Sequence, residues 1–395
     1  MKKFVSLILS LAFAGSTFAQ MSGYSSSQSD GTTLGANETL TADGIALGNA
    51  VKLRGYVDFV FKYDDEDKDN GAQNESFDSS TDLDFLFDLS PVTAELHLTA
   101  NTDEANLEQV FGRYSVNQDF HITFGRQLTV LGFESDEAPG LYAVTSAHLV
   151  DKYMSNLFTD FDDQDVFSGF RRNYVDGVRL NYNNGMFGLT AGLHDGYWGG
   201  DDFNGDNLAI DLAASIMFFP GLEARIGYAH QALDVDSANE LIGSFKSTLR
   251  TGIAIPGGTW SLPNATKDGD INQFNAWLSY SPGALTLATE FDTYSFDLGN
   301  GGGDDYWSWM LLANYQFTDW FAATLRYTHE EIDLGGGVET DSDRITLATL
   351  FTLTDHFGIN VEYSTASVDS SSNSKLVGLD SGDYDEFLVE GLITY

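Results

Sequence analysis

Histidine is the side chain that most often carries acid–base or zinc chemistry, and this sequence shows no recognisable arrangement of it. The seven histidines are scattered along the chain: His97, His121, His148, His194, His230, His329 and His356. Neither a Gly-x-Ser-x-Gly nucleophile motif nor a His-Glu-x-x-His zinc motif is present. The sequence therefore argues against an enzyme.

Two acidic segments have the alternating oxygen atoms of a calcium-binding loop. One contains Asp65, Asp67 and Asp69, and the other spans residues 202–206. In the first segment the glycine comes one place too late for the standard calcium loop, and the twelfth position is not Glu. We therefore interpret both segments as solvated acidic loops, with weakly bound Ca²⁺ or Mg²⁺ as the alternative. No other cofactor is expected.

The overall charge is strongly negative, with a formal net charge of −40. Residues 1–19 combine Lys2 and Lys3, a short apolar run and small residues up to Ala19, which predicts a cleaved signal peptide. Its removal leaves 17 of the 19 basic residues against 59 acidic ones. Such a chain repels nucleic acid and attracts cations.

The elements that position these charges are strands with alternating apolar and polar residues. The first predicted strand, residues 51–63, is longer than an ordinary soluble strand and matches a tilted strand that crosses a membrane. No stretch is long and apolar enough for a membrane-spanning helix. About sixteen strands are expected, at residues 51–63, 83–89, 92–100, 107–116, 120–127, 175–182, 187–194, 208–218, 222–230, 274–280, 285–294, 307–317, 321–330, 344–353, 357–364 and 384–395.

The connections between these strands alternate in length. Short links with Pro-Gly or Asn-Gly turn chemistry fall at residues 90–91, 117–119, 183–185, 219–221, 281–283, 318–319 and 354–356. Long acidic loops lie between them, at residues 63–80, 128–173, 195–207, 231–271 and 366–383. This sorting predicts an all-β, antiparallel, up-and-down transmembrane barrel over residues 51–395, in the cell outer membrane. Residues 20–50 are interpreted as a flexible lead-in with one helical turn near residues 42–47.

The last predicted strand has an apolar row that ends on an aromatic side chain. Phe387, Val389, Gly391, Ile393 and Tyr395 share one face. We interpret this row as a membrane-insertion signal for the barrel-assembly machinery, with outer-membrane lipid and lipopolysaccharide as the surroundings of the folded chain. An edge strand of a soluble sandwich is the alternative.

The basic residues within strands test the orientation of the two faces. Nine fall in predicted strands: Lys52, Arg54, Lys62, Arg113, Arg126, Arg179, Arg225, Arg326 and Arg344. Alternation turns all of them inward except Arg126, which follows the outward Phe124. Either a bulge at Gly125 re-aims Arg126, or its side chain reaches the membrane interface. The inward set predicts a lumen lined by charge.

The connection at residues 128–173 mixes acidic residues with many apolar ones, such as Val130, Leu131 and Phe133. A solvated loop of this length would not keep so many apolar side chains. We therefore expect it to fold into the lumen.

Gly125-Arg126-Gln127 leads into this loop, and Phe387–Tyr395 forms the last strand. With these features the chain resembles the general bacterial porins, and in detail the OmpL-like β-barrel porins. The resemblance implies a homotrimer and a pore constricted by the third loop. Carried over, Glu134, Asp136 and Glu137 lie on the loop, opposite Arg54, Arg113, Arg126 and Arg179 on the wall. The general-porin loop motif Pro-Glu-Phe-Gly-Gly is absent, and only Gly132-Phe133-Glu134 is similar to it.

The expected function is passive diffusion of small hydrophilic solutes and ions through the outer membrane, with a modest preference for cations. The pore-lining set would then also include Arg225, Arg326 and Arg344. A sugar-specific channel, with Tyr197, Trp198, Trp260 and Asn264 as stacking or polar residues, and a non-conducting adhesin barrel are the alternatives.

Overall fold

The computed structural model describes residues 44–66, 73–135, 137–148, 172–198, 208–248, 254–255, 258–259, 263–301, 303–333, 339–371 and 381–395. The predicted signal peptide and residues 20–43 lie outside these ranges, as do Asp67, Asp69, Asp136 and Trp260.

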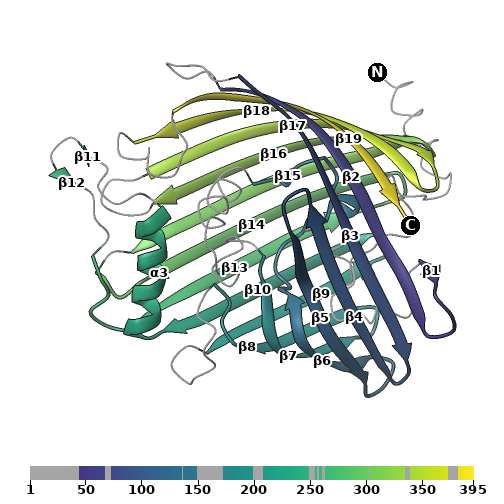
Figure 1. The fold of residues 1–395 in the computed structure, drawn as a ribbon, viewed down its shortest axis with the longest axis horizontal. Helices are drawn as coiled ribbons and strands as arrows, with labels where there is room; N and C mark the ends of the chain where they lie inside the picture. Colours follow the sequence, from purple (N-terminus) through teal and green to yellow (C-terminus); the bar gives the residue numbers. More distant parts are fainter. Residues whose placement is uncertain are drawn as a thin grey trace.

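Sixteen antiparallel strands form one closed barrel (Figure 1). Each strand pairs with its neighbours in the sequence, and β2 pairs with β19 to close the sheet. The strands are β2 (Val51–Glu66), β3 (Gln73–Leu89), β4 (Val92–Asn101), β5 (Ala105–Ser115), β6 (Phe120–Leu128), β7 (Tyr174–Asn183), β8 (Phe187–His194), β9 (Ala209–Phe219), β10 (Leu222–Leu233), β13 (Gly269–Tyr280), β14 (Leu285–Asp297), β15 (Asp304–Thr318), β16 (Phe321–Asp333), β17 (Glu339–Thr354), β18 (Phe357–Ser370) and β19 (Gly382–Thr394). The predicted up-and-down barrel is confirmed.

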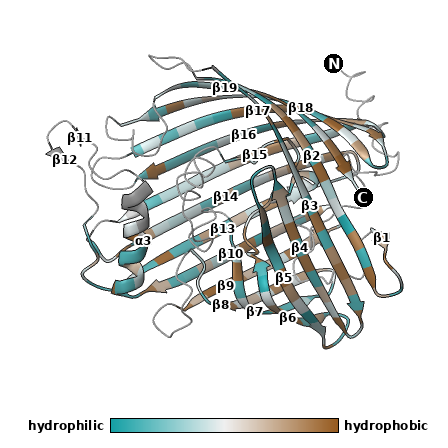
Figure 2. Cartoon of the chain, in the orientation of Figure 1, coloured by the Kyte–Doolittle hydropathy of each residue, from teal (hydrophilic) through white to brown (hydrophobic). Residues whose placement is uncertain are grey.

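Alternating residues point to the outside and to the interior of the barrel, as the two-residue period of a strand requires. In β17, Ile345 and Leu347 face outward and are 51% and 52% exposed, whereas Arg344 and Thr346 face inward and are buried. The hydropathy colours alternate along many strands in the same way (Figure 2). An exposed apolar belt of this extent is unfavourable in water and is typical of a barrel surrounded by lipid.

Tight turns join the strands at the end of the barrel where β2 begins and β19 ends. In the turn between β7 and β8, the Asn184 side-chain oxygen accepts hydrogen bonds from the backbone N–H groups of Met186 and Phe187 (3.0 and 2.8 Å), and Gly185 has a φ of +83°. Between β9 and β10, Gly221 has a φ of +89°. Asn and Gly were therefore correct turn signals at these positions.

Residues 45 and 46 form a short strand, β1 (Ile45–Ala46), rather than the expected helical turn. They pair with Leu53 and Lys52 of β2. The pairing of β19 with β2 ends at Gly55, which exchanges backbone hydrogen bonds with Tyr395 (3.1 and 3.0 Å). The β2 residues before Gly55 therefore have an edge that β19 does not cover. The open edge explains the difference, because its unpaired backbone groups gain partners from an extended segment.

At the opposite end the strands continue beyond their predicted limits, and the polarity of the two faces inverts. In β14, Tyr294 and Phe296 face inward and are buried, while Ser295 between them faces outward. Ile332 of β16 and Val368 of β18 are buried in the same way. Residues 63–66 and 73–80 of the first predicted loop, and residues 366–370 and 382–383 of the last, are strand. One connection at this end, residues 102–104, is short.

The inverted rows enclose an apolar cluster inside this end of the barrel. Leu131, Tyr197 and Trp198 from the connections pack there with Tyr294 and Tyr306. Helix α3 (Val235–Thr248) adds Ala238 and Ile242. With β11 (Ala254–Ile255) and β12 (Gly258–Thr259), α3 occupies a connection expected as a loop. No helix in the described ranges has the length and apolar character to cross a membrane.

Candidate functional site

The segment of residues 129–148, which follows β6, contacts inward-facing side chains on distant strands. The Phe133 N–H donates to Glu290 of β14 (2.7 Å). The N–H groups of Val144 and Thr145 donate to one oxygen of Glu362 on β18 (2.8 and 2.9 Å), and the Thr145 hydroxyl donates to the other (2.6 Å). Two wall carboxylates thus hold the backbone of this segment.

Arg326 of β16 supplies the strongest charged contact to the segment. Its Nη1 donates to both oxygens of Glu134 (2.8 and 3.0 Å), and its Nη2 donates to the carbonyl oxygens of Thr145 and Ser146 (2.9 and 3.0 Å). Arg326 and Glu134 are each 1% exposed. The neighbouring Arg344 of β17 donates to Thr145 Oγ1 (3.1 Å) and to Glu386 (2.8 Å). Charge-assisted bonds of this kind are about twice as strong as neutral ones.

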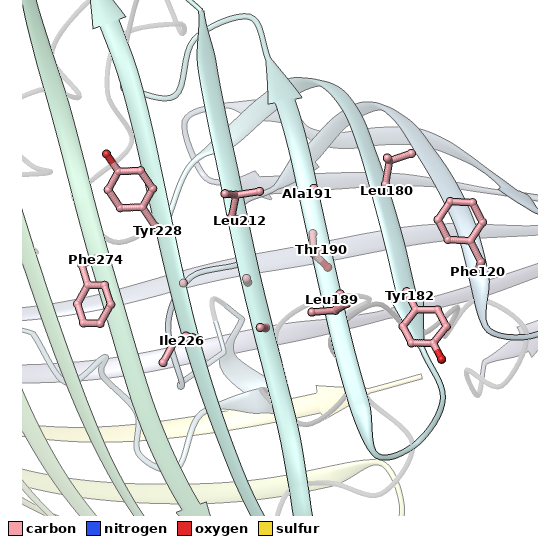
Figure 3. Close-up of a pocket in the computed structure, with 13 residues that line it drawn as sticks. Phe120, Leu180, Tyr182, Leu189, Thr190, Ala191, Leu212, Ile226, Tyr228 and Phe274 are labelled. Atoms are coloured by element: carbon pink, nitrogen blue, oxygen red, sulfur yellow. The ribbon is translucent and has the colours of Figure 1, made fainter.

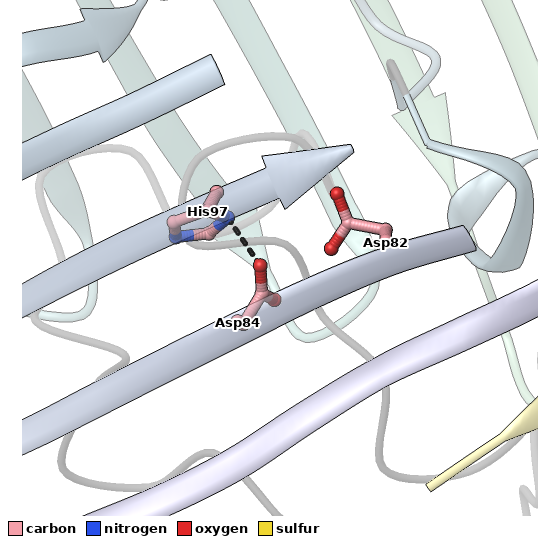
Figure 4. A group of neighbouring side chains, drawn as sticks. All are labelled: Asp82, Asp84 and His97. Carbon is pink, nitrogen blue, oxygen red and sulfur yellow. Dashed lines mark ion pairs between the residues drawn. The ribbon is translucent and has the colours of Figure 1, made fainter. Parts of the chain in front are cut away.

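A second charged group runs across β2 to β5 as a chain of buried ion pairs. Arg54 pairs with Asp84 (2.8 Å), and Arg113 pairs with Glu95 (3.2 Å). His97 is 2.7 Å from Asp84 (Figure 4). Its other ring nitrogen is 2.9 Å from Glu95. Basic and acidic side chains alternate along this row of ion pairs, so each charge has neighbours of opposite sign.

A third group depends on a glycine. Arg179 of β7 pairs with Asp211 of β9 (2.8 Å) across the intervening strand β8. The residue between them in the pairing register is Gly192. A Cβ atom there would collide with the Asp211 carboxylate and with His194. Gly192 is therefore required for the close approach of the two charges.

The inward placement of Arg54, Arg113, Arg179, Arg225, Arg326 and Arg344 agrees with the predicted alternation, since each is buried in the interior. Arg126 instead keeps the outward parity and pairs with the exposed Asp176 (3.2 Å), so it does not line the lumen. The bulge interpretation at Gly125 is wrong for this side chain, although Gly125 itself has a φ of +118°.

The partners of these arginines differ from those that the resemblance implied. Glu134 pairs with Arg326 rather than with any of the four wall arginines that the resemblance implied. Arg54, Arg113 and Arg179 pair with carboxylates of adjacent or next-but-one strands. Glu137 instead lies beside Asp82 and Glu108.

The sequence analysis overlooked the inward acidic residues of the wall, Asp84, Glu95, Asp211, Glu290 and Glu362. Their inward placement was readable from the alternation, since Asp84 lies between the outward-facing Leu83 and Phe85. The sugar-stacking candidates Tyr197 and Trp198 are only 2% and 1% exposed. Arg225 stacks on the ring of Trp277, with 4.9 Å between the guanidinium carbon and the ring centroid.

A shallow groove of about 480 Å³ lies on the outer wall of the barrel (Figure 3). Leu180, Leu189, Leu212, Ile226 and Phe274 line it, and each is an exposed outward side chain. The groove therefore belongs to the surface that lipid would cover.

No protein-family model matches this chain, and no curated protein matches its sequence. Solved structures do match its fold. OmpT of Vibrio cholerae aligns with a TM-score of 0.57 at 14% identity, over 88% of this chain and 98% of that one. The anion-selective porin of Comamonas acidovorans aligns with a TM-score of 0.58 at 14% identity, over 88% and 99%. The outer-membrane channel DcaP of Acinetobacter baumannii gives 0.56 at 12%, over 89% and 99%.

The chain therefore has the sixteen-stranded barrel fold of outer-membrane porins.

Proposed function

We propose that this chain is an outer-membrane channel through which small hydrophilic solutes and ions diffuse passively. The observation that carries the proposal is the closed barrel with an apolar outer face and a charged inner face, a fold shared with solved porins and channels. Selectivity in such a channel comes from its width and its electrostatic field. Planar-bilayer recording tests this: the folded protein should produce discrete current steps, and folded protein without current would contradict the proposal.

Location and partners belong to the same proposal. The chain would be exported through a cleaved signal peptide ending at Ala19 and inserted by the barrel-assembly machinery, which would read Phe387–Tyr395. Phe387 and Ile393 are each 39% exposed on the outer face of the barrel. This exposure supports the proposal, because an insertion signal in the last strand must also be compatible with lipid. Mass spectrometry of the outer-membrane fraction tests the location and the cleavage site together.

The segment of residues 129–148 would narrow the lumen. Its bonds to Glu290, Arg326 and Glu362 support this role. The interior arginines are almost fully buried, so the passage should be narrow and the single-channel conductance should be small for a barrel of this size. A large ohmic conductance would contradict this part.

A modest cation preference follows from the net charge of −40, which concentrates cations at the mouths. The fold does not set the sign, because the Comamonas acidovorans neighbour is anion-selective. Reversal potentials in a salt gradient measure the preference, and a clear anion preference would contradict it. The triple variant E134Q/D136N/E137Q should lower it.

A homotrimer is the proposed assembly, supported by a solved OmpT described as a trimer form. Light scattering of the protein in detergent would give the mass of the assembly, and a monomer mass would contradict the proposal.

No catalytic step is proposed for this barrel. A sugar-specific channel remains the second candidate, although the burial of Tyr197 and Trp198 removes two of its four stacking or polar residues. Block of the current by sugar at low concentration would favour it. Folded barrels that carry no current would favour the adhesin.

A further inference from the structure

One carboxylate in the barrel interior is buried without a donor. Asp82 of β3 is 1% exposed, and neither of its side-chain oxygens has a hydrogen-bond partner among the described residues. A buried carboxylate in this condition is strongly destabilised unless a cation or a proton neutralises it. A cation, or a proton shared with the neighbouring Asp84, is therefore expected on Asp82.

Two further carboxylates converge on Asp82. One oxygen each from Asp82, from Glu108 of β5 and from Glu137 lie within 4.8 Å of one another. Glu137 is 5% exposed and precedes the short 3-10 helix η2 (Ala138–Gly140), and its side chain does not cap that helix. Its carboxylate is instead close to the other two.

The nearby positive charges have other partners. Arg54 bonds Asp84 through two nitrogens (2.9 and 2.8 Å), and Arg113 bonds Glu95 (3.2 Å). His97 is 2.7 Å from Asp84 (Figure 4). Figure 4 shows Asp82 beside the Asp84–His97 pair without an ion pair drawn to either. None of these ion pairs includes Asp82.

The spacing of the three oxygens fits a calcium ion. Ca²⁺ binds carboxylate oxygens at about 2.3–2.6 Å in flexible geometry, so two ligands on opposite sides are up to about 5 Å apart. Mg²⁺ requires about 2.0–2.1 Å and strict octahedral positions. We propose that Asp82, Glu108 and Glu137 bind one Ca²⁺, which ties the 129–148 segment to β3 and β5 in the barrel wall.

None of the three proposed ligands belongs to the acidic segment at residues 65–69. It would also give the segment a second attachment, since Glu134 of the same segment reaches Arg326. The ion would complete the wall-to-segment contact on the β3–β5 side.

Equilibrium dialysis of the folded full-length protein in detergent against Ca²⁺ tests the proposal. Acidic surface loops will bind additional ions weakly, so the comparison between variants decides. Asp82→Asn should bind one Ca²⁺ per chain fewer than the wild type, and Glu137→Gln should show the same loss. The matched control is Asp319→Asn, an exposed aspartate in a tight turn, which should bind as the wild type does.

Terbium luminescence gives an independent readout. Tyr56 of β2 is the register partner of Asp82 on β3, so its excitation should sensitise Tb³⁺ in this site. Ca²⁺ should quench the signal by competition at a concentration at least tenfold lower than Mg²⁺. Heat-modifiable gel migration confirms that each variant is folded. Equal Ca²⁺ stoichiometry in the wild type and Asp82→Asn would overturn the proposal and indicate that Asp82 is a protonated acid.

Discussion

At the scale of single residues, the Arg326–Glu134 pair is the central contact between the wall and the 129–148 segment. Arg326→Gln leaves the Glu134 carboxylate buried without its partner. Breaking a buried ion pair in this way costs about 3–5 kcal/mol. We expect a matching fall in unfolding free energy, measured by urea titration in detergent, together with noisier single-channel currents.

Arg126→Gln is the matched control for this experiment. It also removes an arginine from an ion pair, but Arg126 and Asp176 are 25% and 58% exposed. Exposed pairs contribute about 0–1 kcal/mol, so this variant should differ little from the wild type. If both variants lose the same stability, the segment does not depend on Arg326.

Gly192 makes a second prediction at this scale. Gly192→Ala puts a methyl group between Arg179 and Asp211, where it meets the Asp211 carboxylate and His194. Overpacking of this kind typically costs about 1–3 kcal/mol, measured by the same titration. Gly303→Ala is the control, because a Cβ atom there meets nothing within 4 Å. A stability unchanged by Gly192→Ala would show that the Arg179–Asp211 pair can move aside without loss.

At the scale of elements, the inversion of the two faces marks where the wall leaves the apolar belt. Leu347 of β17 and Ser367 of β18 both face outward, but Leu347 lies in the apolar row and Ser367 lies in the inverted region. Leu347→Arg should lower the unfolding free energy by roughly 2–4 kcal/mol in lipid. Ser367→Arg should cost little. Equal losses would mean that the belt extends over both positions.

The N-terminal cap of helix α3 should depend on pH. Asp234 accepts a hydrogen bond from the Ser237 N–H (2.8 Å), and this bond lowers the pKa of Asp234 below its ordinary value. The folded pKa is the lower one, so the stabilisation is complete above about pH 4 and is lost as the pH falls through the lowered value.

Hydrogen exchange of residues 235–248 measures this effect. Protection should fall in acid, and Asp234→Asn should retain the cap while removing the pH dependence. Loss of protection in acid that is identical in Asp234→Asn would place the sensitive group elsewhere.

The same inversion explains what the sequence could and could not predict at this scale. Strands were recognisable wherever apolar residues faced lipid, and all sixteen were located. Beyond the belt, as at Tyr294-Ser295-Phe296, the apolar residues face inward and the polar residue faces outward. A prediction that places every apolar row on the outer face therefore ends the strand too early. The ion pairs were not predicted because they depend on register between strands, which turn lengths and bulges set. One example is the irregularity between β4 and β5 near His97.

At the scale of the whole molecule, the outward apolar belt should decide how the protein behaves in solution. We expect the purified chain to aggregate without detergent and to migrate faster on gels before heating than after, because a closed barrel resists unfolding by detergent. Analytical ultracentrifugation without detergent provides the opposing outcome. A soluble, monodisperse chain would exclude a barrel that faces lipid.

The seam between β2 and β19 has a consequence for the order of assembly. Tyr395 bonds the carbonyl oxygen of Asp82 (3.3 Å), a residue 313 positions earlier in the chain. A contact between residues this far apart closes a long chain loop and forms slowly, so we expect the β2–β19 seam to close late in folding. We therefore expect the 129–148 segment, which contacts Glu290, Arg326 and Glu362, to make these contacts before the β2–β19 seam closes. A group held inside the barrel would then be enclosed while the barrel folds. Afterwards it could exchange only through the two ends of the barrel.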